Sequence, residues 1–188
     1  MTLSPQLLGR LALLGLAAGL LQIAAVSQVS VLEVRADLTP LVVMSVGLLC
    51  GSMAGALMGF GLGLFVDTAL LQTLGISSLI LLTVGYGAGR LRELRDPAHA
   101  LTPVAVGAAG TAAAAIGFSL MQFLLGVDAP VSLLLIREIL ATIALNAILA
   151  LPVYALVRRV LLPYLPGDPR RRRRRAYMTG GLSPISRA

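Results

Sequence analysis

Few side chains in this sequence are of the types that carry out chemistry, and they lie far apart. There is one histidine, His99, in a polar stretch and one cysteine, Cys50, in an apolar stretch. Neither has the companion residues that a metal site or a disulfide needs. The acidic residues stand singly, and the sequence contains no Gly-x-Ser-x-Gly, His-Glu-x-x-His or Gly-x-x-x-x-Gly-Lys motif. We therefore predict that the protein is not an enzyme and has no catalytic residues, no bound metal and no cofactor.

Asp67 is the acidic residue with the most unusual position, because it is the only formal charge between Asp37 and Arg90. A charge inside or at the edge of a hydrocarbon-embedded segment is costly and usually has a function. We predict a structural charge pair between Asp67 and Arg137 near the outer face of a membrane, since carboxylate and guanidinium form a bidentate, charge-assisted pair. The alternative is that Asp67 lies at a helix end and faces headgroups and water. Asn146, further along the chain, is predicted to make a hydrogen bond between helices.

A row of glycines at every fourth position precedes Asp67, namely Gly47, Gly51, Gly55, Gly59 and Gly63. Small residues four apart in an apolar helix allow the backbone of a second helix to approach closely. The row therefore predicts a helix-packing surface. The second helix belongs either to this same chain or to another membrane protein, and the sequence leaves both alternatives open.

Long apolar segments must position these residues. Of the 188 residues, 57% are hydrophobic and 12% are charged, which predicts an all-α, polytopic membrane protein. We predict six transmembrane or membrane-embedded helices, over residues 3–29, 40–51, 53–70, 75–89, 101–125 and 132–157. The first is interpreted as a retained span rather than a cleaved signal peptide, because Arg10 lies inside it. Five spans with the N-terminus outside are the alternative, with two long helices in place of the three between residues 38 and 89.

The positions of the arginines predict the orientation in the membrane. All 15 basic residues are arginine, and cytoplasmic loops are enriched in basic residues. Since most of them lie near the N-terminus, at residues 90–95 or near the C-terminus, we predict that both termini are cytoplasmic. We predict one transmembrane domain over residues 1–165 and a disordered cytoplasmic tail over residues 166–188. The tail is expected to contact anionic lipid through Arg170, Arg171, Arg172, Arg173, Arg174 and Arg175.

This run of six arginines accounts for all but one of the formal net charge of +7. The basic charge therefore belongs to the tail. It does not predict a nucleic-acid-binding surface.

Several segments together resemble the rod shape-determining protein MreD family. They are Asp37-Leu38, GALMGFGLGLFVD at residues 55–67, Leu74-Gly75 and GYGAGR at residues 85–90, and the resemblance extends over about residues 5–160. It implies a non-enzymatic scaffold in the bacterial inner membrane that takes part in cell elongation, peptidoglycan synthesis and the regulation of cell shape. The implied partners are MreC and, through MreC, MreB, RodA and a class B penicillin-binding protein, besides membrane lipids. The family is also similar in helix arrangement to the substrate-binding subunits of energy-coupling-factor transporters.

That second similarity gives an alternative function, a vitamin-like small-molecule binding subunit of a membrane transporter. Such a subunit needs an outward-facing pocket with several converging hydrogen-bonding groups. The polar residues expected on the outward side are few: Gln28, Glu33, Arg35, Asp37, Gln72, Thr73, Asp128, Arg137 and Glu138. The scaffold is therefore the predicted function.

Overall fold

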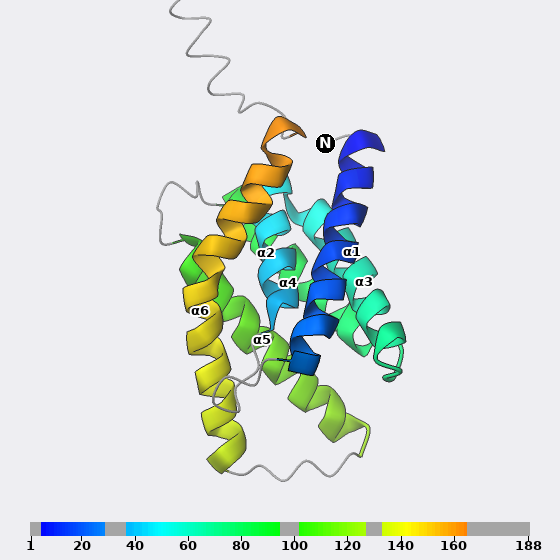
Figure 1. Ribbon diagram of the computed structural model, residues 1–188. Coiled ribbons are helices and arrows are strands. Elements are labelled where there is room, and N and C mark those ends of the chain that lie inside the picture. The colour runs from blue at the N-terminus through cyan, green and yellow to red at the C-terminus, as the bar shows by residue number, and fades with distance from the viewer. Residues whose placement is uncertain (1–4, 29–36, 95–101, 127–132, 165–188) are drawn as a thin grey trace, which may run out of the picture.

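Six α-helices run side by side in the computed structural model (Figure 1). The structure describes residues 5–28, 37–94, 102–126 and 133–164. Their elements are α1 Pro5–Gln28, α2 Leu38–Cys50, α3 Ser52–Ala69, α4 Ile76–Leu94, α5 Thr102–Leu124, α6 Leu133–Leu161 and a 3₁₀ turn, η1, Leu162–Tyr164. Over these residues, the prediction of an all-helical fold with six helices is confirmed. The largest difference in bounds is in α4, which continues beyond residue 89 to Leu94.

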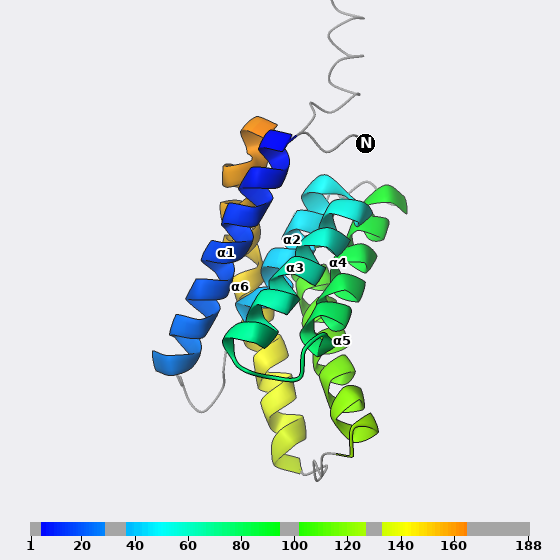
Figure 2. The ribbon, with the colours of Figure 1, turned by 90° about the vertical axis from the view of Figure 1, so that its right-hand side faces the viewer.

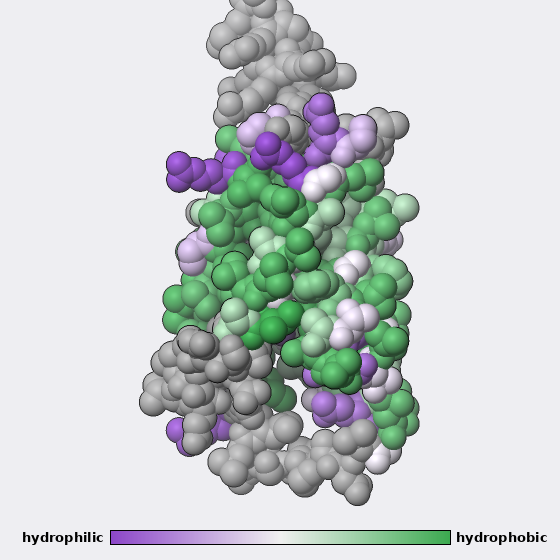
Figure 3. Space-filling view, turned by 45° about the vertical axis from the view of Figure 1, so that its right-hand side comes forward, coloured by the Kyte–Doolittle hydropathy of each residue, from purple (hydrophilic) through white to green (hydrophobic). Residues whose placement is uncertain are grey.

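Successive helices alternate in direction, so the start of α1 and the end of α6 lie at the same end of the bundle (Figures 1 and 2). The ends of α2 and α4 lie there as well. This end carries Arg10, Arg90, Arg92, Arg158 and Arg159, and we call it the arginine end. Hydrophilic residues gather at the arginine end in the space-filling view, while apolar residues cover the middle of the molecule (Figure 3).

The shortest of the six helices, α2, lies at the centre. It contacts each of the other five helices, and every residue from Thr39 to Leu49 is buried. A helix that is apolar on all sides is expected in a core. Because protein encloses α2, the length that a lipid-facing span needs does not apply to it.

Local signals in the sequence set the ends of α2. Asp37 caps the start, where its Oδ1 accepts a hydrogen bond from the Thr39 backbone N–H at 3.1 Å. Gly51 ends the helix with a φ of 98°, a conformation that glycine adopts without strain. The chain then turns directly into α3, which begins at Ser52.

Four stretches of the described residues are long and apolar enough to cross a membrane: Pro5–Ala24, Ser52–Ala69, Thr102–Leu124 and Ile139–Leu161. The last two turns of α4 carry Arg90, Arg92 and Glu93. Together, the apolar spans indicate an integral membrane protein whose helices differ in length.

Candidate functional site: the α3–α4 interface and its polar ends

The predicted glycine row does not lie on one helix. Gly47 belongs to α2, Gly51 lies at the break between helices, and Gly55, Gly59 and Gly63 belong to α3. The positive φ of Gly51 separates the two parts. The row therefore consists of two parts that meet at Gly51, close to where the sequence predicts one helix to end at residue 51 and the next to begin at residue 53.

The α3 part of the row lies directly against the backbone of α4. A Cβ atom placed on Gly59 would lie 2.2 Å from the carbonyl oxygen of Leu81, and one on Gly63 would lie 2.4 Å from the Cα of Ser78. Real Cβ atoms essentially never approach another heavy atom within 3.0 Å. These two positions therefore have room for no side chain larger than hydrogen.

Two glycines of α4 complete the interface. Gly85 and Gly55 face each other: a Cβ on Gly85 would lie 2.2 Å from the Gly55 oxygen, and one on Gly55 would lie 2.3 Å from the Gly85 oxygen. A Cβ on Gly89 would lie 2.3 Å from the Cα of Ser52. Gly85 and Gly89 were not predicted to pack against α3, although their spacing of four residues is a signal for this second row.

The contacts of the glycine row thus lie within the chain. Gly47 also faces α4, since its Cβ would lie 2.6 Å from the Gly85 oxygen. Of the two alternatives left open by the sequence, internal helix packing accounts for Gly47, Gly55, Gly59 and Gly63. These four glycines are therefore covered by other parts of the chain.

Asp67 stands one turn beyond Gly63 and fastens the turn between α3 and α4. Its Oδ2 accepts a hydrogen bond from the Gly75 backbone N–H at 2.8 Å, and its main-chain oxygen accepts one from Gln72 N–H at 3.0 Å. The side chain is buried, and its Oδ1 has no hydrogen-bond partner among the described residues.

The predicted charge pair of Asp67 and Arg137 is not formed. Arg137 lies in the first turns of α6 with an exposed side chain, and the ion pair found among the described residues joins Arg90 and Glu93 instead. Asp67 satisfies one oxygen with backbone N–H of the adjacent turn. The competing interpretation, a helix-end residue facing headgroups and water, does not fit a side chain that is 1% exposed.

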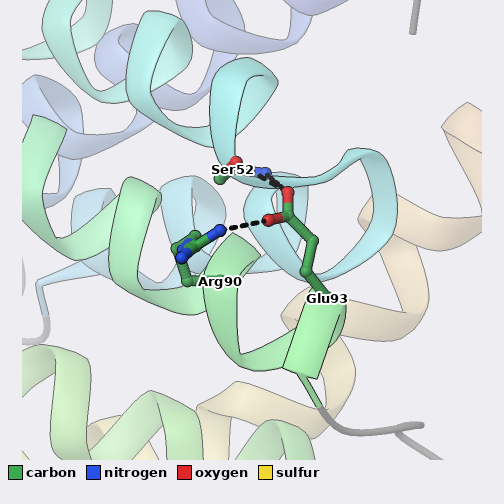
Figure 4. A network of polar contacts seen from close by, with 3 residues as sticks. All are labelled: Ser52, Arg90 and Glu93. Atoms are coloured by element: carbon green, nitrogen blue, oxygen red, sulfur yellow. Dashed lines mark hydrogen bonds and ion pairs between the residues drawn. The ribbon is translucent and has the colours of Figure 1, made fainter.

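A polar clamp holds the other end of the interface, where α2, α3 and α4 meet (Figure 4). Glu93 Oε1 accepts hydrogen bonds from the Ser52 backbone N–H at 3.1 Å and from Ser52 Oγ at 2.6 Å, which caps the start of α3. Glu93 Oε2 accepts one from Arg90 Nη1 at 3.2 Å. Arg92 donates to the Leu49 carbonyl oxygen at the end of α2. The last turn of α4 therefore fastens both helices at the Gly51 break.

The hydrogen bonds from Ser52 also act on the charge state of the clamp. They lower the pKa of Glu93 from its ordinary value of 4.5, and the bond from Arg90 adds to the effect. Glu93 therefore stays ionised at neutral pH. This contact could not be predicted from local sequence, because Ser52 and Glu93 are 41 positions apart.

Asn146 makes the predicted hydrogen bond between helices. Its Nδ2 donates to Thr111 Oγ1 of α5 at 3.0 Å and to the Asp37 carbonyl oxygen at 2.9 Å. Asn146 is fully buried, so these bonds tie the start of α2 to α5 and α6 in the interior.

An apolar groove of about 320 Å³ runs between α1 and α3. Gly61 lies in it, and a Cβ on Gly61 would meet no atom within 4 Å. The groove is lined by apolar or glycine residues, namely Leu8, Leu11, Ala12, Gly15, Leu16, Met58, Gly61, Leu62 and Phe65. We call this surface the α1–α3 groove.

Three other features were noted in the sequence, namely Cys50, His99 and the arginine run. Cys50 is a free, partly exposed thiol. His99 and the run Arg170–Arg175 lie outside the described residues. Within the described part of the chain, no group of three or more His, Cys, Asp or Glu side chains could hold a metal ion.

Comparison with known proteins gives one match. The family model described as rod shape-determining protein MreD matches residues 7–160. No curated protein and no solved structure matches the chain. The similarity in helix arrangement to energy-coupling-factor subunits therefore stays a prediction, and the comparisons give no support to the transporter alternative.

Proposed function

This chain belongs to the rod shape-determining protein MreD family, and from that premise we propose that it is a non-enzymatic scaffold that binds MreC and positions the wall synthases. The observation that carries the proposal is the family match, which covers nearly the whole length of the six helices. Family membership supports a role in rod shape determination. We propose that the chain takes part in this process by binding MreC. Through MreC it would associate with MreB, RodA and a class B penicillin-binding protein.

The proposed location is the bacterial inner membrane, with both termini in the cytoplasm. The arrangement of charge supports this orientation. Five arginines of the described residues, from α1, α4 and α6, lie at one end of the bundle, and basic residues favour the cytoplasmic side. The opposite end, which carries Asp37 and Asp67, would then face outward.

We assign the binding of MreC to the α1–α3 groove, with a transmembrane helix of MreC as its occupant. Since α4 covers the glycine row, close backbone approach by a partner needs another small residue, and Gly61 offers it on the outer face of α3. Large apolar side chains around Gly61, namely Leu57, Phe60 and Leu64, are exposed. They would supply the dispersion contacts on which helix association in lipid depends.

Co-purification of MreC with the tagged chain tests both parts of the proposal. A Cβ on Gly61 would meet no atom within 4 Å, so Gly61→Leu places a side chain in the groove without a backbone clash, and we expect normal yield and loss of MreC. Gly87→Leu is the matched control, because Gly87 of α4 also has open space around its Cβ but lies outside the groove. It should retain MreC.

The outcomes separate the two parts. Retention of MreC by Gly61→Leu would remove the groove from the proposal and leave the scaffold. Failure of the unsubstituted chain to bind MreC would overturn the scaffold itself.

A further inference from the structure

A second concave surface, a polar pocket of about 220 Å³, lies at the end opposite the arginine end. Five helices and the α3–α4 turn contribute to it. Six of its lining residues are polar: Gln22 of α1, Asp37 and Thr39 at the start of α2, Gln72 of the turn, Ser77 of α4 and Gln122 of α5. Only Asp37 and Gln72 were among the outward polar residues considered from the sequence. We call this cavity the five-helix pocket.

Four of these six polar side chains make no hydrogen bond within the described part of the fold. Among the described residues, the side chains of Thr39, Gln72, Ser77 and Gln122 make no hydrogen bond to another residue, although Thr39 and Ser77 are buried. Buried polar groups are almost always hydrogen-bonded, to protein, water or ligand. Gln72 and Gln122 are exposed, so these four side chains are available to hydrogen-bond water or a ligand in the pocket.

Hydrogen bonds from three helices hold Asp37, the acidic residue of the pocket, and its backbone in place. The Asp37 carbonyl oxygen accepts from Asn146 Nδ2 at 2.9 Å, and Oδ1 accepts from Thr39 N–H at 3.1 Å. The next residue, Leu38, donates its N–H to Gln22 Oε1 at 2.9 Å. Oδ2 of Asp37 has no described partner. A fixed carboxylate oxygen binds a ligand without first having to be ordered, which favours affinity.

The charge and size of the pocket select the class of ligand. Asp37 is the single charged residue among the described lining residues, and none of them is basic, so the pocket disfavours anions and favours a cation. Phe118 adds an aromatic ring, whose face also attracts cations. At ~30 Å³ per water molecule the volume equals about seven waters, which fits a small group.

We infer that the five-helix pocket binds the ammonium group of a small amine, with the amine anchored on Asp37 and its other polar atoms on the surrounding hydroxyl and amide groups. The amine is either a free molecule or the headgroup of phosphatidylethanolamine. Both sources present the same ammonium group. This inference is independent of the binding of MreC.

Thermal unfolding and calorimetric titration of the full-length chain in phosphatidylcholine nanodiscs test it, with ethanolamine as the probe. Ethylene glycol, which has a hydroxyl in place of the ammonium group, is the matched probe. We expect ethanolamine to raise the melting temperature and to bind, and ethylene glycol to do neither. Asp37→Asn keeps the helix cap, because asparagine caps as well as aspartate, and should weaken ethanolamine binding by about tenfold or more through loss of a charge-assisted bond.

Glu93→Gln is the control variant, since it removes a carboxylate at the opposite end of the molecule. Measured against its own melting temperature without ligand, it should respond to ethanolamine like the unsubstituted chain. Equal responses to both probes, no response to ethanolamine, or unchanged binding by Asp37→Asn would overturn the inference. Nanodiscs that contain phosphatidylethanolamine distinguish the sources: weaker ethanolamine binding there identifies the lipid headgroup, and unchanged binding identifies a free amine.

Discussion

Gly59 and Gly61 lie two residues apart in α3 and face in different directions. The position of a Cβ on Gly59 is 2.2 Å from the backbone of α4, whereas a Cβ on Gly61 would meet nothing within 4 Å. The inner face of α3 therefore packs backbone against backbone, and the outer face presents apolar side chains with a gap at Gly61. Glycine content alone does not distinguish the two faces. The spacing of four residues does, since it keeps one line of small residues on the side toward α4.

The largest effect that separates the two faces is expected from Gly59→Leu. Overpacking typically costs about 1–3 kcal/mol, occasionally more, and here the atoms met are backbone of Leu81 and Leu82, which cannot rotate away. We expect the variant to lose most of its membrane yield. Gly61→Leu and Leu64→Ala, on the outer face, should accumulate normally and melt near the unsubstituted temperature.

Yield and melting temperature in detergent measure the difference. Normal accumulation of Gly59→Leu with an unchanged melting temperature would show that the inner face is not the packing surface described above.

The next largest effect concerns Asp67, which continues the inner face by one turn. Asp67→Leu removes the acceptor of the Gly75 N–H and should cost about 1–3 kcal/mol, the usual penalty for a buried polar group left unpaired. Asp67→Asn retains an acceptor oxygen, so we expect it to recover much of the loss. Melting temperatures of the two variants measure the contribution of the hydrogen bond.

The same residue allows a test of the discarded charge pair. The double exchange Asp67→Arg, Arg137→Asp is expected to be no better than Asp67→Arg alone, because the two side chains are not partners. Recovery of stability by the double exchange would show that Asp67 and Arg137 are partners after all.

Hydropathy and the positions of the arginines were sufficient to predict six helices, and glycine spacing was sufficient to predict a helix-packing surface. Hydropathy identifies the apolar residues, and glycine spacing identifies the helix face that carries small residues. They could not predict which helix covers that face, because several helices of the chain are rich in small residues. In the structure, α4 covers that face, and Gly85 and Gly89 of α4 form a second row of small residues against α3.

The partner of Asp67 was missed for a different reason. Counting residues from the arginines gives a depth along the membrane normal and no direction around a helix. Asp67 and Arg137 both lie toward the end of the bundle opposite the arginine end. However, Asp67 is enclosed in the bundle and Arg137 is exposed on α6. The actual donor is a backbone N–H, a group that every residue except proline carries, so residue type gave no signal for it.

The smallest effect is expected at the start of the inner face, where Glu93 caps α3. The pKa of Glu93 is lowered in the folded protein, so its charged form stabilises the fold above the ordinary pKa of 4.5, and this contribution is lost as the pH falls through the lowered value. Glu93→Gln should therefore reduce the melting temperature slightly at neutral pH. The difference from the unsubstituted chain should disappear in acid.

Two further variants show which contact carries the effect. Because the hydrogen bonds from Ser52 lower the pKa of Glu93 more than Arg90 does, Ser52→Ala should reduce the pH-dependent difference more than Arg90→Gln. The reverse order would mean that the exposed ion pair, rather than the cap on α3, stabilises this end. Exposed pairs of this kind usually contribute little, and the short 2.6 Å bond from Ser52 Oγ favours the cap.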